Sequence, residues 1–260
     1  MSDNYSENTL VEQPAIKLFA ELGWEMANCF NESFGDSPSP LSPLPGGEGK
    51  AEIFLGRETK AEVVLVSRLR PVLEKLNPDL PSEAIDLATE ELIRDRSRMS
   101  MAAANREIYQ LIKNGIKVKI PDADGDGDTI EIVRVIDWNE PANNDYFLAS
   151  QFWITGEMYT RRADLVGFVN GLPLVFMELK ATHRRLKTAY TDNLTDYKSA
   201  IPQLFWYNAL IILSNGSKSE VGSVSAEWEH FADWKKINSE GEEGIISPAE
   251  VLRARPWWFA

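Results

Sequence analysis

The sequence predicts a mixed α/β domain in which helices flank a central sheet. Apolar residues recur at helical spacing through the first 114 residues, and short apolar runs typical of strands follow between residues 116 and 180. A further helix and strand come after these runs. Helices first, hairpin strands next and a helix with a strand last is an order that indicates a mixed sheet covered by helices.

Three helices are predicted in the N-terminal part, over residues 5–23, 57–77 and 82–114. Gly23 ends the first, prolines separate the second from the third, and Asn114-Gly115 ends the third. Pro14 fits the first helix only if its regular part begins near that residue. Residues 34–49 are rich in Pro, Gly and Ser, which predicts a flexible insertion.

Strands and one more helix are predicted in the rest of the chain. The strands cover residues 116–120, 130–137, 146–155, 163–169, 173–180 and 208–214, and the helix covers roughly 189–201. Residues 122–127 match the start of a calcium loop, D-x-D-x-D-G. Val133 stands where that loop needs its last ligand, a glutamate, so an acidic hairpin turn is the better interpretation.

Composition and charge limit the kinds of site that the chain can build. One cysteine and two histidines leave no Cys/His zinc site, so any metal must be held by carboxylates, which favours Mg²⁺, Mn²⁺ or Ca²⁺. The single Cys29, the absence of a signal peptide and the absence of an apolar run of about eighteen residues predict a cytoplasmic protein without a membrane span. The net charge of −13 opposes DNA binding by the whole surface, but residues 161–198 carry seven Lys and Arg against four Asp and Glu.

The most informative stretch runs from Arg162 to Lys180. Asn170-Gly171 between two apolar runs predicts a hairpin turn. The second run is almost wholly apolar and ends in Glu178-Leu179-Lys180, where the alternation of a strand puts Glu178 and Lys180 on one face. An acid beside a base at the end of a buried strand is unusual enough to require an explanation.

Phosphodiester hydrolysis explains these residues if Asp164 joins them. Two carboxylates can hold a hard cation that polarises a phosphate and lowers the pKa of a bound water. Lys180 would orient or activate that water and stabilise charge in the transition state. Because D…E-x-K is a short pattern, the alternative is that Asp164 and the Glu178–Lys180 pair are solvated strand-end residues.

The register of the hairpin decides whether the three residues can meet. A regular two-residue turn at 170–171 would set Ala163 opposite Glu178 and turn Asp164 to the other face. We therefore predict an irregularity that shifts the register by one residue. Gly167 is a natural site for a β-bulge, and a three-residue loop that uses Gly171 is the alternative.

Blocks of residues beyond the triad carry a resemblance to a known family. The blocks are, in order, SENTLVE (6–12), LNPDLP (76–81), ANRE (104–107), IDW (136–138), NND (143–145), RxD…NGLP…ELK (162–180), IPQLF with YN (201–208) and SNG (214–216). Over most of residues 5–236 the chain resembles the N-terminal region of the R, or restriction and motor, subunit of type I restriction-modification enzymes. The resemblance implies a RecB-like PD-(D/E)xK restriction-endonuclease fold over residues 1–237 and, over 238–260, a linker toward a helicase motor that this chain lacks.

The resemblance also implies an activity, cofactors and partners. The activity is cleavage of double-stranded DNA in defence against foreign DNA, with Mg²⁺ or Mn²⁺ bound at Asp164 and Glu178. The partners are DNA, the modification and specificity subunits, and the motor on the same polypeptide. ATP is not expected to bind this piece, which has no G-x-x-x-x-G-K-[ST] phosphate loop. The rival function is a non-catalytic docking or scaffold module of the restriction complex.

Auxiliary residues follow from the same resemblance. The family's Q-x-x-x-Y motif falls by distance on Asn193 and Tyr197, with Asn in place of Gln, whereas the literal match is Gln203 and Tyr207. Glu12, and less so Glu7, would lend a third metal ligand or would simply be solvated.

Several other residues allow more than one interpretation. Arg162 would contact a phosphate or pair with Asp164. His183, Arg184 and Arg185 suit phosphate contacts or form a solvated charged run. Trp228, Trp234, Trp257 and Trp258 are expected in the core or at a motor interface rather than as platforms for bases.

Overall fold

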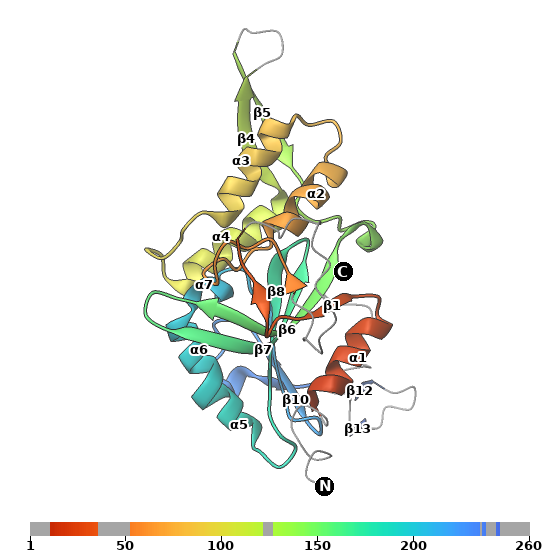
Figure 1. The fold of residues 1–260 in the computed structure, drawn as a ribbon, viewed down its shortest axis with the longest axis vertical. Coiled ribbons are helices and arrows are strands. Elements are labelled where there is room, and N and C mark those ends of the chain that lie inside the picture. The colour runs from red at the N-terminus through yellow and green to blue at the C-terminus, as the bar shows by residue number, and fades with distance from the viewer. Residues whose placement is uncertain (1–10, 36–52, 122–126, 235, 238–242, 245–260) are drawn as a thin grey trace, which may run out of the picture.

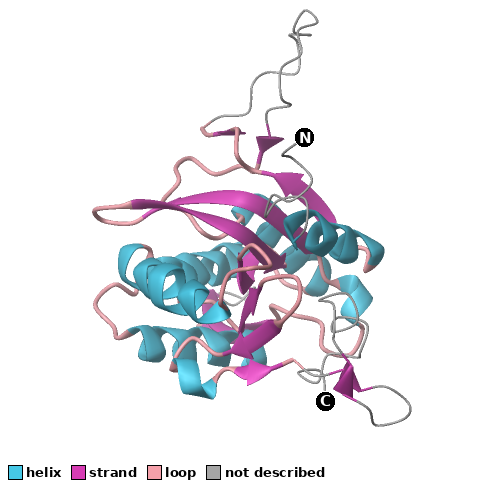
Figure 2. Ribbon diagram, turned by 90° about the horizontal axis from the view of Figure 1, so that it is seen from below, coloured by secondary structure: helices cyan, strands magenta, loops and turns pink. Residues whose placement is uncertain are grey.

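A seven-stranded mixed sheet forms the centre of the molecule. The computed structural model describes residues 11–35, 53–121, 127–234, 236–237 and 243–244. The strand order is β1-β6-β7-β8-β9-β10-β11, in which the β1–β6 and β8–β9 pairs are parallel and the others antiparallel. Strands β6, β7 and β8 lie together near the middle of the molecule (Figure 1). Helices lie on both sides of the strands (Figure 2). The predicted mixed sheet flanked by helices is confirmed.

The strands of this sheet are β1 (Glu25–Asn28), β6 (Tyr146–Thr155), β7 (Thr160–Val169), β8 (Leu172–Leu179), β9 (Leu210–Ser214), β10 (Ser219–Gly222) and β11 (Ala232–Asp233). Three small sheets pair β2 (Glu32–Ser33) with β3 (Ile53–Phe54), β4 (Ile116–Pro121) with β5 (Asp128–Val133), and β12 (Lys236–Ile237) with β13 (Glu243–Gly244). The α-helices are α1 (Gln13–Glu21), α2 (Val66–Leu76), α3 (Ser82–Ile93), α4 (Met101–Asn114), α5 (Leu186–Thr188), α6 (Thr195–Ala200) and α7 (Pro202–Phe205). A π-helical turn (Ala189–Leu194) joins α5 to α6, and short 3₁₀ turns cover Pro141–Asn143 and Trp228–His230.

Helix α1 covers one face of the sheet. Its buried side chains, among them Ala15 and Phe19, pack on apolar residues of β6 to β9 such as Leu165 and Met177. Pro14 lies in the first turn, where a missing N–H does no harm, and Gly23 follows the helix with a φ of +84°. The predicted limits near Pro14 and Gly23 are therefore confirmed, whereas residues 5–10 lie outside the described residues.

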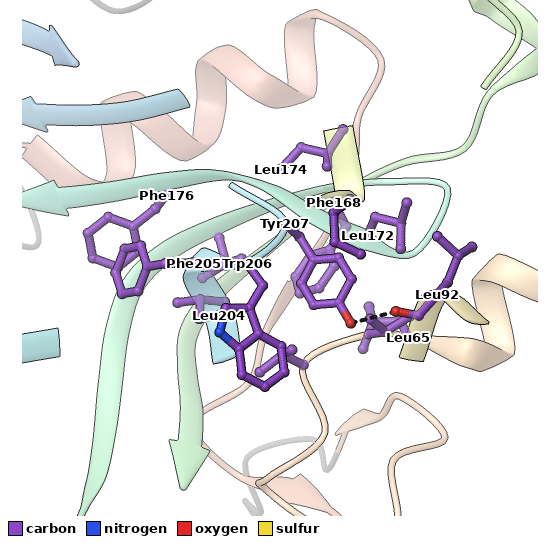
Figure 3. Close-up of a cluster of buried hydrophobic side chains, with 14 of the residues drawn as sticks. Leu65, Leu92, Phe168, Leu172, Leu174, Phe176, Leu204, Phe205, Trp206 and Tyr207 are labelled. Atoms are coloured by element: carbon purple, nitrogen blue, oxygen red, sulfur yellow. Dashed lines mark hydrogen bonds between the residues drawn. The ribbon is translucent and has the colours of Figure 1, made fainter. Parts of the chain in front are cut away.

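The opposite face of the sheet carries the larger core. Figure 3 shows part of it, where Phe168 and Phe176 of β7 and β8 meet Phe205 and Tyr207 from the end of α7 and the turn after it. The ring centroids of Phe176 and Phe205 are 5.2 Å apart. This packing holds α6 and α7 against the face of β7 and β8, the strands that carry the candidate site.

Two of the predicted helices are wrong in extent, and a buried arginine lies in the non-helical part of each. The helix predicted over 57–77 begins only at Val66, and Arg57 is 1% exposed and bonds to groups from distant segments. The helix predicted over 82–114 is two helices, α3 and α4. Between them the buried Arg96 donates to the carbonyls of Glu91, Leu92 and Arg94, and the Ser100 hydroxyl caps α4.

The predicted strands are confirmed, with ends that shift by a few residues, although the strand expected over 130–137 ends at Val133. β4 and β5 form a hairpin apart from the main sheet. Residues 36–49 of the predicted loop, the acidic turn at 122–126 and most of the predicted linker at 238–260 lie outside the described residues. Among the described helices, none combines the length and the apolar character that a membrane span requires.

Candidate active site

The β7–β8 hairpin contains the predicted register shift. Val169 pairs with Leu172 and Phe168 with Pro173, but Gly167 pairs with Val175, so Leu174 is an extra residue on β8. The turn itself has two residues, Asn170 and Gly171, with φ of +52° and +75°. The predicted irregularity is therefore a β-bulge rather than a three-residue loop, and its extra residue lies on β8, opposite Gly167.

The bulge brings Asp164 to the level of Glu178. Leu165 and Met177 are the last pair of the β7–β8 ladder. Beyond them the Asp164 carboxylate, through Oδ2, accepts a hydrogen bond of 2.9 Å from the backbone N–H of Leu179. This side-chain hydrogen bond takes the place of the next backbone hydrogen bond between β7 and β8. It holds the Asp164 carboxylate against the backbone of Leu179, the residue after Glu178.

Glu178 and Lys180 form a buried ion pair. Glu178 is 1% exposed, and its Oε1 lies 2.8 Å from Nζ of Lys180. The backbone N–H of Lys180 donates to the carbonyl of Ser214 (2.8 Å) and so extends the parallel pairing of β8 with β9. A carboxylate at this depth requires a cation and hydrogen bonds to remain charged, and Lys180 supplies one such contact.

Tyr197 on α6 lies beside the same carboxylates. Its hydroxyl donates to the carbonyl of Arg162 (2.9 Å) and is hydrogen bonded to the side chain of Asn193. Burial raises the pKa of the Tyr197 phenol, and the negative charges of Glu178 and Asp164 raise it further. The phenol is therefore a neutral hydrogen-bond donor at physiological pH.

The literal Gln-Tyr match has a different surrounding. Nε2 of Gln203 donates to the carbonyl of Thr155 (2.9 Å), and the hydroxyl of Tyr207 donates to the carbonyl of Leu92 (2.8 Å, Figure 3). Tyr207 is 4% exposed within the larger core. These contacts are structural, so the geometry favours Asn193 and Tyr197 as the pair near the site.

Glu12 lies beside Gln151 of β6. Its Oε1 and Oε2 accept hydrogen bonds of 2.9 and 3.0 Å from Nε2 of Gln151. In the β6–β7 register Gln151 falls between the pairs Ser150–Leu165 and Phe152–Ala163, and it adopts a φ of +56°. Within the described part of the chain, no three Asp, Glu, His or Cys side chains gather closely enough to hold a metal. Gln151 thus contacts Glu12 from the level of Asp164 on the neighbouring strand, a contact that local sequence did not indicate.

The basic candidates lie at the surface around the site. The Arg162 guanidinium stacks on the rings of Phe30 and Trp153, at 5.3 and 5.4 Å from their centroids. His183, Arg184 and Arg185 are exposed in the turn after β8, and the carbonyl of Arg184 accepts a hydrogen bond of 2.9 Å from Asn215.

Of the four tryptophans singled out in the C-terminal part, Trp228 packs against the larger core beside Tyr190 and Phe231, as predicted for a core residue. Trp234 is partly exposed. Trp257 and Trp258 lie outside the described residues.

The donor set suits a small hard cation. Asp164 and Glu178 offer carboxylate oxygens from adjacent strands, and Mg²⁺ typically binds through one or two carboxylates while keeping several waters. The described residues place no cysteine or histidine ligand beside them, so they do not resemble a zinc site. The two carboxylates therefore fit Mg²⁺ or Mn²⁺.

A comparison with known protein families agrees with this geometry. Residues 4–230 match the model of the family described as the type I restriction enzyme R protein N terminus. The chain belongs to this family. The resemblance inferred from the sequence blocks is confirmed.

Two curated relatives are similar to the chain over most of its length. The type I restriction enzyme HindI endonuclease subunit of Haemophilus influenzae is 33% identical over 244 residues, which cover 91% of this chain and 21% of the relative. The putative type I restriction enzyme MjaIXP endonuclease subunit of Methanocaldococcus jannaschii is 27% identical over 248 residues, or 93% of this chain and 22% of the relative. The chain thus spans about a fifth of the length of these restriction subunits.

Proposed function

We propose that this R-protein N terminus is a PD-(D/E)xK nuclease domain with a RecB-like fold that cleaves double-stranded DNA by hydrolysis. The register shift at Gly167 carries the proposal, because it sets Asp164 beside Glu178 and Lys180 at the end of a buried strand. The kinship with type I endonuclease subunits supports the same activity, as part of a restriction system directed against foreign DNA.

Each residue of the site has a role that its contacts support. Asp164 and Glu178 would hold Mg²⁺, for which Mn²⁺ can substitute, and the bound ion would polarise the phosphate and acidify a water molecule. Lys180, fixed by Glu178, orients the attacking water and offers positive charge to the phosphate oxygens. Asn193 supplies a neutral amide donor. Tyr197 holds Asn193 through their hydrogen bond, while its own proton is donated to the carbonyl of Arg162. Arg184 offers a charged contact to a neighbouring phosphate.

The partners of the activity follow from the longer relatives. In a complete R subunit the domain would act with a helicase motor on the same polypeptide and with modification and specificity subunits, and ATP would bind to the motor. The net charge of −13 supports this division, because an acidic domain depends on other parts of the complex to hold DNA.

The test compares two lysines that each pair with a buried glutamate. Lys180→Ala removes the ammonium group that pairs with Glu178. Lys218→Ala removes the one that lies 2.7 Å from Oε1 of Glu220 on β10 and 2.7 Å from Asp233. Both glutamates are buried. Nicking of supercoiled plasmid in Mg²⁺ or Mn²⁺ should fall by about 100-fold or more in Lys180→Ala and stay near the wild-type rate in Lys218→Ala. Equal nicking by Lys180→Ala and the wild-type chain would remove the mechanism.

Metal binding gives a second readout that does not depend on cleavage. Asp164→Asn keeps an oxygen that can accept the hydrogen bond from Leu179 but loses the charge. Calorimetric titration with Mn²⁺ should show binding by the wild-type chain and much weaker binding by Asp164→Asn. Unchanged Mn²⁺ affinity in this variant would favour the docking module over the nuclease.

A further inference from the structure

An aromatic and cationic surface lies at the far ends of β6 and β7, two residues from Asp164. Five side chains form it, and we name it the aromatic platform: Phe30, Phe34, Lys60, Trp153 and Arg162. Besides the stacking of Arg162 on Phe30 and Trp153, Nζ of Lys60 lies 4.9 Å from the Trp153 ring centroid and 5.7 Å from that of Phe34. Phe30 is 43% exposed, so part of its ring faces solvent.

The platform is held in place from below by the buried Arg57. The guanidinium donates to both carboxylate oxygens of Glu32, to the carbonyl of Glu62 (2.7 Å) and to the carbonyl of Trp153 (3.2 Å). It also stacks on Phe152 at 4.0 Å from the ring centroid. Three segments that are distant in sequence are thereby fixed together before any ligand arrives, which lowers the entropy lost on binding.

The cations of the platform are available to an anion. Within the described residues neither Lys60 nor Arg162 forms an ion pair with a carboxylate, although the chain has 40 acidic against 27 basic residues. The neighbouring Arg161 differs, because it is paired with Asp196. Aromatic rings that stack bases, next to cations that contact phosphates, are the combination found in binding sites for single-stranded nucleic acid.

The location connects the platform to the proposed chemistry. Arg162 pairs with Trp153 across β6 and β7 and precedes Asp164 by two residues, or about 7 Å along a strand. The carbonyl of Arg162 also accepts the hydrogen bond from Tyr197 beside the site carboxylates. A nucleotide seated on the platform would therefore be a close neighbour of the phosphate at Asp164.

We infer that the aromatic platform binds the DNA strand next to the cleaved phosphate by stacking an unpaired base on Phe30, while Arg162 and Lys60 contact phosphates. This inference rests on the proposed nuclease function and deepens it, because it assigns the chain a preference for a locally unpaired strand at the cut site. It gives Arg162 a phosphate contact and assigns Phe30 a role that the triad does not require.

The experiment measures binding of two single-stranded oligonucleotides in EDTA, one of thymidines and one with abasic positions, so that cleavage cannot interfere. Phe30→Ala should bind the thymidine oligonucleotide about tenfold more weakly and the abasic one as well as the wild-type chain does. Phe30→Tyr, which keeps a ring, should bind both like the wild type. Arg162→Gln should weaken the binding of both and reduce the salt dependence by roughly one phosphate contact.

The control is a second exposed ring beside a cation, far from the site in sequence. Tyr109 on α4 is 52% exposed and has Nζ of Lys113 at 5.6 Å from its ring, and Tyr109→Ala should leave both affinities unchanged. Equal losses for the two oligonucleotides in Phe30→Ala, or no loss, would overturn the inference, as would a wild-type chain that binds neither. Failure of the nuclease itself would appear separately, as wild-type nicking in Lys180→Ala.

Discussion

Replacing Arg57 by alanine should destabilise the fold more than any substitution of a surface arginine. The side chains of Arg57 and Glu32 are 1% and 0% exposed, and they are paired through both carboxylate oxygens. Removing the guanidinium leaves a buried negative charge and takes the donors away from the carbonyls of Glu62 and Trp153. All three groups lose contacts that water cannot easily replace.

The magnitude follows from these contacts. Breaking a buried ion pair by removal of one partner destabilises a protein by about 3–5 kcal/mol. Since each kcal/mol lowers the melting temperature of a domain of this size by about 2–4 °C, the expected fall is roughly 10 °C. The pair also links the segment that carries Phe30 to β6, so the aromatic platform should lose its order in the same variant.

Urea unfolding followed by circular dichroism measures the change, with Arg70→Ala as the control. Arg70 also pairs with two carboxylates, of Glu74 and Asp86, but is 37% exposed, so its removal should hardly move the midpoint. The double variant Arg57→Met/Glu32→Leu removes both charges and should recover much of the lost stability. Equal midpoints for Arg57→Ala and Arg70→Ala would refute the reasoning.

Two further predictions concern the hairpin turn and the buried phenol. A Cβ at Gly171 (φ +75°) would lie 2.5 Å from the carbonyl oxygen of Leu65, so Gly171→Ala should lose at least about 2 kcal/mol in urea unfolding. Gly23→Ala, with a similar φ and no atom within 4 Å of its Cβ, should lose only about 1 kcal/mol, and equal losses would exclude the collision as the cause. Because the pKa of Tyr197 is raised in the folded chain, the unfolded chain loses the phenol proton at a lower pH than the folded chain does. The free energy of unfolding should therefore decline as the pH rises above about 10, and it should decline less in Tyr197→Phe. Phenolate absorbance near pH 10 should be the same in folded Tyr197→Phe and in the folded wild-type chain. A lower absorbance in Tyr197→Phe would show that Tyr197 is ionised at that pH and that its pKa is not raised.

The four central strands and the register of the site could be predicted because their signals are local, whereas β1, β10 and β11 were not predicted. Asn170-Gly171 defines the turn, the apolar run after it defines a buried strand, and Gly167 marks the level of the bulge, whose extra residue lies on the facing strand. Counting residues from the turn then showed that Asp164 and Glu178 could meet only through an irregularity. Nothing distant in sequence was needed for that step.

The features that sequence reasoning missed depend on distant partners. Arg57 and Arg96 look like ordinary helix-surface residues, yet each is buried among carbonyls and carboxylates. Each lies in a part of a predicted helix that is not helical. Gln151 gave no signal, because both its positive φ and its contact with Glu12 arise only in the assembled sheet. The same holds for Phe30 and Trp153, which meet Arg162 from separate segments.

The extra residue at Leu174 provides a counting rule for related chains. In a regular hairpin with a two-residue turn, an even number of residues lies between any two that face each other. Between Asp164 and Glu178 there are thirteen. A relative that is one residue longer or shorter between its two acids can therefore align them in an unbroken ladder. A relative that differs by two residues must retain an insertion like the one at Leu174, and the parity of that interval can be read from an alignment alone.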